Sequence, residues 1–225
     1  MSIKHWPEGE RPREKLLERG AGALSDAELL AILLRVGTRG MSAVDLARYL
    51  LNGFGSLGKL MNADIKSLSS YKGMGTASFT QFAVVKEIGR RILSEELREN
   101  IIFSNPQTVA DYLRLNLGHE RVEVSYALLL NRQNQLIAMR ELSRGTVAEN
   151  TVYIREIVKL ALDEYADSLI IAHNHPGGSA RPSEADIGFT KRLAQALDLV
   201  DVSLLDHFIV TAKEVCSLRE TGYMD

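Results

Sequence analysis

Through the first hundred residues, apolar positions recur at helical spacing, and glycines separate one apolar stretch from the next. Ser25 and Ser42 each precede such a stretch and are predicted helix N-caps. Helices of this length are unstable alone, so they must pack on each other. The pattern therefore predicts an all-α bundle with helices over 12–19, between Ser25 and Gly37, and over 43–51, 63–69 and 77–97.

The pattern changes near residue 100, where a polar run closes with Asn105-Pro106. Short apolar runs with strand character then alternate with amphipathic helical stretches. The sequence thus predicts an α+β protein with an all-α domain over residues 1–100 and an α/β domain over residues 104–225. In the second domain we expect helices over 109–117, 153–165 and 184–197, and strands over 123–130, 135–142 and 168–172. A last β segment over 202–211 carries Asp206 and His207, and residues 217–225 are expected to be a polar end.

Composition and charge exclude few functional classes. Residues 1–100 carry 15 basic and 12 acidic side chains, and residues 101–225 carry 12 and 17, a mild split that permits a nucleic-acid contact without predicting one. No apolar run is long enough to span a membrane, and the first residues lack the apolar centre of a signal peptide, so we expect a cytoplasmic protein. Cys216 is the only cysteine, which excludes an intramolecular disulfide and a thiolate zinc cluster.

Two histidines follow the apolar run 168–172, where Pro176 and the next two glycines end the strand. His173 and His175 are two residues apart, so on an extended chain both imidazoles point to one face while Asn174 points away. Asp186 falls in the first turn of the following helix, and a short loop can bring it beside the imidazoles. Two nitrogens and one carboxylate, with a fourth position open to water, form the pattern of a catalytic zinc site. Other first-row divalent ions also suit these ligands, and magnesium is disfavoured.

A purely structural interpretation exists for each half of this stretch. Ser183 three residues before Asp186, ahead of an apolar run, is also a helix N-cap pattern. Isolated histidines are commonly surface groups or hydrogen-bonded core groups. The combination H-x-H-x(7)-S-x-x-D requires four residue types at fixed positions, and this favours a metal site.

These residues resemble a known signature. His173, His175, Ser183 and Asp186 match the zinc motif of the JAMM (JAB1/MPN) metalloprotease superfamily, and the wording HNHPGG followed by PSEAD is similar to its bacterial RadC branch. The resemblance implies a JAMM/MPN (cytidine-deaminase-like) mixed-sheet domain behind a helical region, with one Zn2+ per chain. It also implies hydrolysis of a peptide or isopeptide bond, while the substrate stays open. The eukaryotic members that cleave ubiquitin isopeptide bonds usually carry Ser or Thr where this chain has Asn174.

Two further roles follow from the resemblance. Glu123, by its place eight residues before Asn131, matches the family's general base, which would take a proton from water and pass it to the leaving amine. Ser183 would donate a hydrogen bond to the oxyanion, a use that competes with helix capping. The rivals of Glu123 for the role of base are Glu120, Glu141 and Glu149. His207 lies between apolar residues, a pattern typical of a hydrogen-bonded histidine in a sheet, and a place beside the metal ligands is favoured over a fourth-ligand role.

The stretch 71–76 resembles the hairpin of a helix-hairpin-helix motif. Gly73 and Gly75 permit unusual backbone angles and leave N–H groups open to a phosphate, so Lys72, Gly73, Gly75 and Thr76 are candidate DNA contacts. The same turn also serves as a connection within a helical bundle. A DNA-associated adaptor with a structural zinc is therefore the rival of the hydrolase, and hydrolysis of another kind of amide is a third possibility.

Overall fold

The computed structural model of the chain describes residues 3, 6–100, 106–145 and 152–224. The chain divides into two compact units, Met1–Glu87 and Ile88–Asp225. This division lies inside one long helix, α6 (Thr76–Glu99), so the sequence-based boundary near residue 100 stays a prediction. Within the described ranges, no helix combines the length and the apolar character that crossing a bilayer requires.

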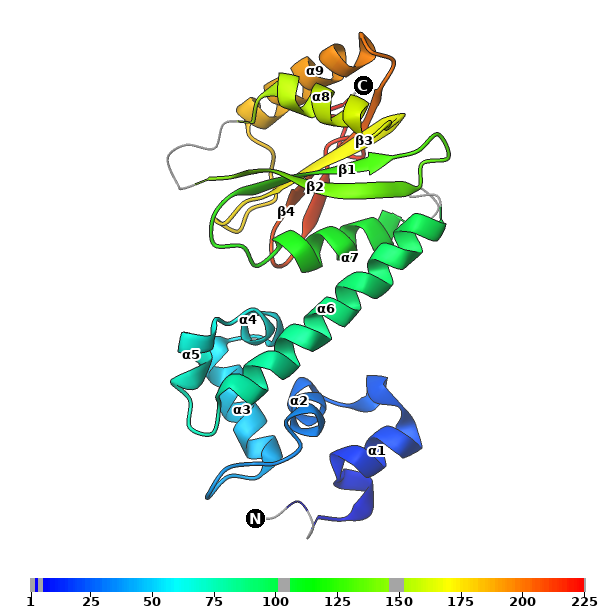
Figure 1. Cartoon of the computed structure of the whole chain (residues 1–225). Coiled ribbons are helices and arrows are strands. Elements are labelled where there is room, and N and C mark those ends of the chain that lie inside the picture. The colour runs from blue at the N-terminus through cyan, green and yellow to red at the C-terminus, as the bar shows by residue number, and fades with distance from the viewer. Residues whose placement is uncertain (1–2, 4–5, 101–105, 146–151, 225) are drawn as a thin grey trace. The chain divides into compact units, whose positions relative to one another are not determined.

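The first unit is helical, as the sequence predicts. Leu30, Val44, Leu50 and Leu60 are among the side chains that form its buried core. The predicted serine N-caps are confirmed, because Ser25 and Ser42 each form a reciprocal capping box. The helices are α1 (Pro12–Arg19), α2 (Asp26–Leu34), α3 (Ala43–Phe54), α4 (Leu57–Met61), α5 (Ile65–Ser69) and the first part of α6, with 3-10 turns at Glu8–Glu10 and Ala21–Ala23 (Figure 1).

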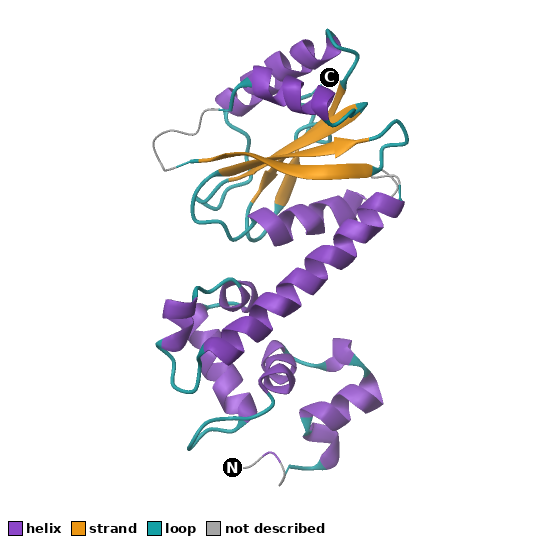
Figure 2. Cartoon of the chain, in the orientation of Figure 1, coloured by secondary structure: helices purple, strands orange, loops and turns teal. Residues whose placement is uncertain are grey.

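The second unit is a five-stranded mixed sheet with helices, so the predicted α+β class is confirmed (Figure 2). The strand order is β2-β1-β3-β4-β5, in which β3 and β4 are parallel and the other neighbours are antiparallel. Its elements are α7 (Pro106–Leu117), β1 (Val124–Leu130), β2 (Leu136–Arg144), α8 (Ile154–Asp163), β3 (Ser168–Asn174), α9 (Glu184–Asp198), β4 (Ser203–Val210) and β5 (Val215–Ser217).

Helices cover both faces of this sheet (Figure 1). Leu128 and Ile170 pack with α7 residues on one face, whereas Ala127 and Ile171 pack with α8 and α9 residues on the other. Alternate residues of β1 and β3 therefore face opposite layers. β3 is buried along its whole length, as expected for a central strand whose two faces are both covered.

Two predicted boundaries were wrong: the end of β3 and the start of the polar C-terminal stretch. β3 continues through His173 to Asn174 instead of ending at Ala172, because the strand pairs with β1 and β4 on both sides. The expected β segment at 202–211 is confirmed as β4, in which the polar pair Asp206 and His207 is buried with hydrogen-bonding partners. The C-terminal stretch, expected to be a polar end, begins with Ser217 in β5 and the fully buried Leu218.

Candidate metal centre

Three side chains converge at the carboxyl end of β3. The Nε2 atoms of His173 and His175 lie 3.0 Å apart. The two carboxylate oxygens of Asp186 lie 3.3 Å from Nε2 of His173 and 3.6 Å from Nε2 of His175. In a tetrahedral zinc site with bonds of about 2.0–2.1 Å, neighbouring ligand atoms are about 3.3 Å apart. The three residues therefore fit a single metal ion of this kind.

The backbone explains this convergence. His173 belongs to β3, and His175 continues the extended chain, since its N–H donates to the carbonyl oxygen of Val210. The chain then turns sharply, with Gly178 at φ +86° and its N–H bonded to the carbonyl oxygen of His175. The loop leads into α9, whose third residue is Asp186.

The electrostatics of the three side chains suit a cation. The Nδ1–H of His175 donates to the carbonyl oxygen of Ser179 at 2.9 Å, which leaves the Nε2 lone pair for a metal. The hydrogen bond with Asp186 raises the pKa of His175, and the charge of Glu123 adds to this effect. Burial acts to raise the pKa of Asp186, but hydrogen bonds from His173, His175 and Ser183 outweigh it and hold this pKa well below its usual range. Asp186 is therefore ionised.

A buried chain of hydrogen bonds holds the Nδ1 side of the His173 ring, opposite the Nε2 atom of the candidate metal position. Its Nδ1 lies 2.8 Å from Nε2 of His207, and Nδ1 of His207 lies 2.6 Å from the Thr190 hydroxyl. That hydroxyl donates to the backbone carbonyl of Asp186 at 2.6 Å. Burial and the neighbouring charge of His173 lower the pKa of His207 to about 3, so His207 is neutral. With Thr190 donating onward, each imidazole donates from Nδ1, and Nε2 of His173 presents its lone pair to the metal position.

Ser183 is the N-cap of α9. Its hydroxyl donates to Asp186 Oδ2 at 2.6 Å and accepts the N–H of Asp186 at 3.2 Å. Its own N–H also donates to that carboxylate oxygen at 2.7 Å. The hydroxyl therefore holds a metal-ligand candidate in place, and its use as an oxyanion donor stays a prediction.

Glu123 immediately precedes β1 instead of beginning it. Ser125 pairs with His173 across the antiparallel β1–β3 ladder, so continuing this register by two residues brings Glu123 opposite His175. The alternation along β1 places Glu123 on the side of the sheet that carries the histidines, in agreement with its effect on the pKa of His175. Its catalytic role stays a prediction.

The two described rivals of Glu123 are engaged elsewhere. Glu120 and Glu141 bind the Arg144 guanidinium at 2.8 Å and 2.9 Å, and Glu141 also accepts the Tyr126 hydroxyl. Glu149 lies outside the described residues. Among the described carboxylates proposed as the base, Glu123 is the one placed beside the histidines.

The candidate DNA contacts lie between α5 and α6. Gly73 has φ +87°, and a Cβ there would lie 2.0 Å from Cγ2 of Thr38, so the turn and its packing already require this glycine. A Cβ at Gly75 would meet nothing within 4 Å. A phosphate contact through Lys72, Gly73, Gly75 and Thr76 stays a prediction.

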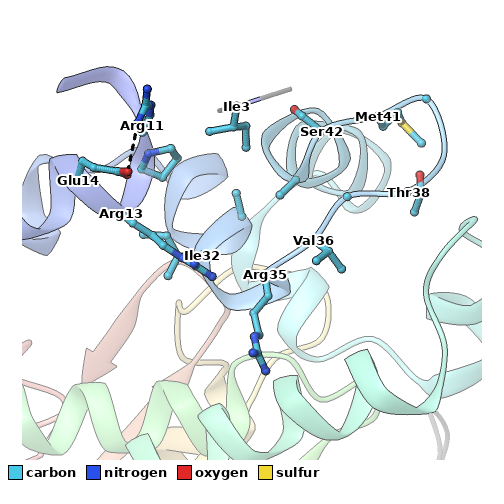
Figure 3. Close-up of a pocket in the computed structure, with 15 residues that line it drawn as sticks. Ile3, Arg11, Arg13, Glu14, Ile32, Arg35, Val36, Thr38, Met41 and Ser42 are labelled. Atoms are coloured by element: carbon cyan, nitrogen blue, oxygen red, sulfur yellow. Dashed lines mark ion pairs between the residues drawn. The ribbon is translucent and has the colours of Figure 1, made fainter. Parts of the chain in front are cut away.

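The first unit also contains a cavity of about 720 Å³, separate from the metal centre. The start of α1, the end of α2 and the loop before α3 line it (Figure 3). Arg11 and Glu14, which form an ion pair, belong to its lining, and Ile32 and Val36 add aliphatic surface. None of the three metal-ligand candidates belongs to this lining.

Sequence reasoning missed two residues that support the centre. The Asn174 side chain was expected only to point away from the metal, yet it binds the backbone on both sides of Glu123. Thr190 was not singled out, although its position four residues after Asp186, on the same face of α9, is a signal that can be read from the sequence.

Two family models together match most of the chain. A family model described as a RadC-like JAB domain matches residues 103–223, and a model described as UPF0758 N-terminal matches residues 3–80. A UPF0758 protein of Neisseria meningitidis serogroup B is 82% identical over 224 residues, covering 100% of both chains. UPF0758 proteins of Neisseria gonorrhoeae and Stutzerimonas stutzeri are 81% and 51% identical over 224 residues, again covering 100% of each chain.

Proposed function

Because this chain belongs to the RadC-like JAB-domain family, we propose that it is a zinc-dependent metallohydrolase that cleaves an amide bond in a peptide or protein. The resemblance to the RadC branch that the sequence indicated is thereby confirmed. The observation that carries the proposal is the convergence of His173, His175 and Asp186 on one point beside the segment of Glu123. Two imidazoles and a carboxylate, with no thiolate, are the ligands of hydrolytic zinc sites.

Each residue has a defined task in this proposal. His173 and His175 present Nε2 lone pairs, and Asp186 supplies the anionic ligand. A bound zinc ion would supply Lewis acidity and bring the pKa of a coordinated water near neutrality. The Glu123 carboxylate accepts the proton of the attacking water and returns it to the nitrogen of the leaving amine. Ser183 keeps Asp186 oriented through its two hydrogen bonds to Oδ2.

The test combines metal content with turnover. Purified protein should contain about one zinc per chain, and His173→Ala should lose it. Turnover is measured by mass spectrometry as new amino termini in N-acetylated peptides from a denatured bacterial lysate, and as free lysine side chains released from lysine-branched peptides. Glu123→Gln should keep the zinc and lower turnover about 10²–10⁴-fold. Glu184→Gln removes an exposed carboxylate at the start of α9 and serves as the matched control, with turnover unchanged. Absence of zinc, or full turnover by Glu123→Gln, would refute the proposal.

A DNA-associated adaptor is the competing function. The open space at Gly75 and the exposed Lys72 in the turn before α6 are compatible with approach of a phosphate backbone. Binding of plain and branched duplex DNA should then weaken steeply as salt rises, and Lys72→Ala should reduce that slope. Such binding, together with no hydrolysis of any peptide, would favour the adaptor over the enzyme.

A further inference from the structure

The residue between the two histidines is buried and holds the backbone on either side of Glu123. Asn174 is 2% exposed. Its Oδ1 accepts the N–H of Val124 at 2.8 Å, while its Nδ2 donates to the carbonyl oxygens of Val122 at 3.0 Å and Glu120 at 3.3 Å. One side chain thus binds the residues directly before and directly after Glu123.

These bonds lie where the pairing of β1 with β3 ends, while the pairing of β1 with β2 continues to Val124 and Arg144. The β1–β3 ladder ends at the pair Ser125–His173, so Glu123 precedes the last paired residue. The Glu123 carbonyl accepts the N–H of Gly145 at 3.0 Å. The ion pair of Glu120 with Arg144 joins partly exposed side chains, and such pairs add little rigidity. The Asn174 amide therefore anchors this segment on the β3 side through buried hydrogen bonds.

The chemistry of the contact selects an asparagine. The backbone groups around Glu123 require one hydrogen-bond acceptor and two donors from a single short side chain, and the planar amide of asparagine provides them. An aspartate of equal size accepts but cannot donate, and it would set an oxygen against two carbonyls. Asn174 also follows one metal-ligand candidate and precedes the other, so its position is fixed by the same extended chain that presents the imidazoles.

We propose that Asn174 is a positioning residue that couples the metal-binding strand to the general base, holding the Glu123 carboxylate at a fixed place beside the metal position. The inference rests on the proposed function, because it takes Glu123 as the base. His173 and His175 face one layer and bind the metal, and Asn174 between them faces the other layer and positions the base. Two of the three metal ligands and the residue that positions the base are then consecutive in the chain.

The test compares Asn174→Asp with two control variants in the full-length protein. Asn131→Ala removes an asparagine at the other end of β1 that also binds backbone, at the N–H groups of Gln133 (2.9 Å) and Gln135 (3.0 Å). Glu123→Gln shows the effect of losing the base itself. Asn174→Ser removes the amide without adding charge, and it replaces Asn174→Asp if that variant does not fold.

Four quantities are measured: zinc stoichiometry, hydrogen exchange of the Val124 amide, kcat and KM on a peptide cleaved by the wild type, and crystal structures of the zinc-loaded proteins. Asn174→Asp should bind one zinc, exchange the Val124 amide about tenfold faster or more, and show a kcat about 10–100-fold lower with KM nearly unchanged. Its structure should show Glu123 displaced by about 1 Å or more. Asn131→Ala should leave all four quantities as in the wild type.

Three outcomes would overturn the proposal. An unchanged exchange rate of Val124 in both Asn174 variants would show that the amide is not an anchor. Loss of zinc in parallel with kcat would show that Asn174 shapes the ligands and not the base. If the wild type cleaves no peptide, that result refutes the hydrolase function but does not test the positioning role of Asn174. The position of Glu123 in the zinc-loaded variant then decides this proposal, and an unmoved Glu123 refutes it.

Discussion

His207 touches no metal position, yet it determines which nitrogen of His173 is available to one. Its neutral ring accepts from Nδ1 of His173, so the lone pair of that ligand stays on Nε2. Partners of this kind orient metal-binding histidines, and their loss typically lowers metal affinity about 10–100-fold. The centre therefore depends on a residue outside the candidate ligand set.

We expect His207→Ala to weaken zinc binding by about that factor, measured by competition with a chromophoric chelator. His207→Gln keeps an oxygen that can accept the same hydrogen bond, so it should retain most of the affinity. Thr190→Val removes the next group in the chain with little change of shape and should cause a smaller loss in the same direction. Wild-type affinity in His207→Ala would contradict the role assigned to the ring.

The same histidine should make the metal-free protein sensitive to acid. Its pKa in the folded protein is about 3, below the ordinary value of 6.5, so between these values the unfolded chain binds a proton that the folded chain does not. This contribution to stability is present above pH 6.5 and is lost as the pH falls toward 3, at up to about 1.4 kcal/mol per pH unit. Urea unfolding with EDTA across this range should show a flatter pH dependence for His207→Gln than for the wild type. Equal slopes would show that the ring is not buried in its neutral form.

Spacing along the chain predicted that the three candidate ligands lie together, but it did not predict the supporting contacts of Asn174 and Thr190. His173, His175 and Asp186 are close in sequence, so strand alternation and one loop suffice to bring them together. The contact of Asn174 with Val124 spans 50 residues, and that of Thr190 with His207 spans 17 residues. Such contacts depend on strand order and helix packing, which one sequence does not specify.

At the scale of single elements, the first turn of α9 both caps the helix and carries a candidate metal ligand. The capping box of α9 uses a candidate metal ligand, Asp186, as its acidic partner. The capping box of α3 has the same chemistry in Ser42 and Asp45, with a hydroxyl-to-carboxylate distance of 2.7 Å against 2.6 Å in α9. The two helices therefore form a matched pair in which only one cap touches the metal centre.

Ser183→Ala and Ser42→Ala should each cost about 1 kcal/mol of stability in urea unfolding, the usual loss for a serine N-cap. Only Ser183→Ala should also weaken zinc binding, about tenfold, because Asp186 loses the hydrogen bond that orients it. Chelator competition on both variants measures the difference. Equal zinc affinity in the two variants would show that the cap and the ligand are independent.

Sequence patterns predicted the long elements better than the short ones. The caps of α2 and α3 and the strand β1 follow local rules that the sequence shows directly. The short helix α4 and the short strand β5 have too few residues to show a period, and tertiary packing of Leu60 and pairing with β4 determine them. β4 was expected as one segment, but the burial of Asp206 and His207 depends on partners that the sequence pattern does not show.

At the scale of the whole molecule, the two units have separate hydrophobic cores. The buried members of the first cluster lie between Ala27 and Phe82, whereas those of the other clusters lie between Leu97 and Leu218. The change of hydrophobic pattern near residue 100 reflects this separation, so the class of each part was predictable from the sequence. The strand order was not, because periodicity does not identify strand neighbours.

Separate cores predict that metal stabilises only one part of the chain. At a zinc concentration 100-fold above the dissociation constant, binding adds about 2.7 kcal/mol to the stability of the unit that holds His173 and Asp186, which raises its melting temperature by on the order of 10 °C. Calorimetry of the full chain should then resolve two transitions, of which EDTA shifts one. His173→Ala should abolish that shift, while Ser42→Ala should lower the other transition alone. A single transition that EDTA moves as a whole would show that the two cores unfold together, and the metal would then stabilise the entire chain.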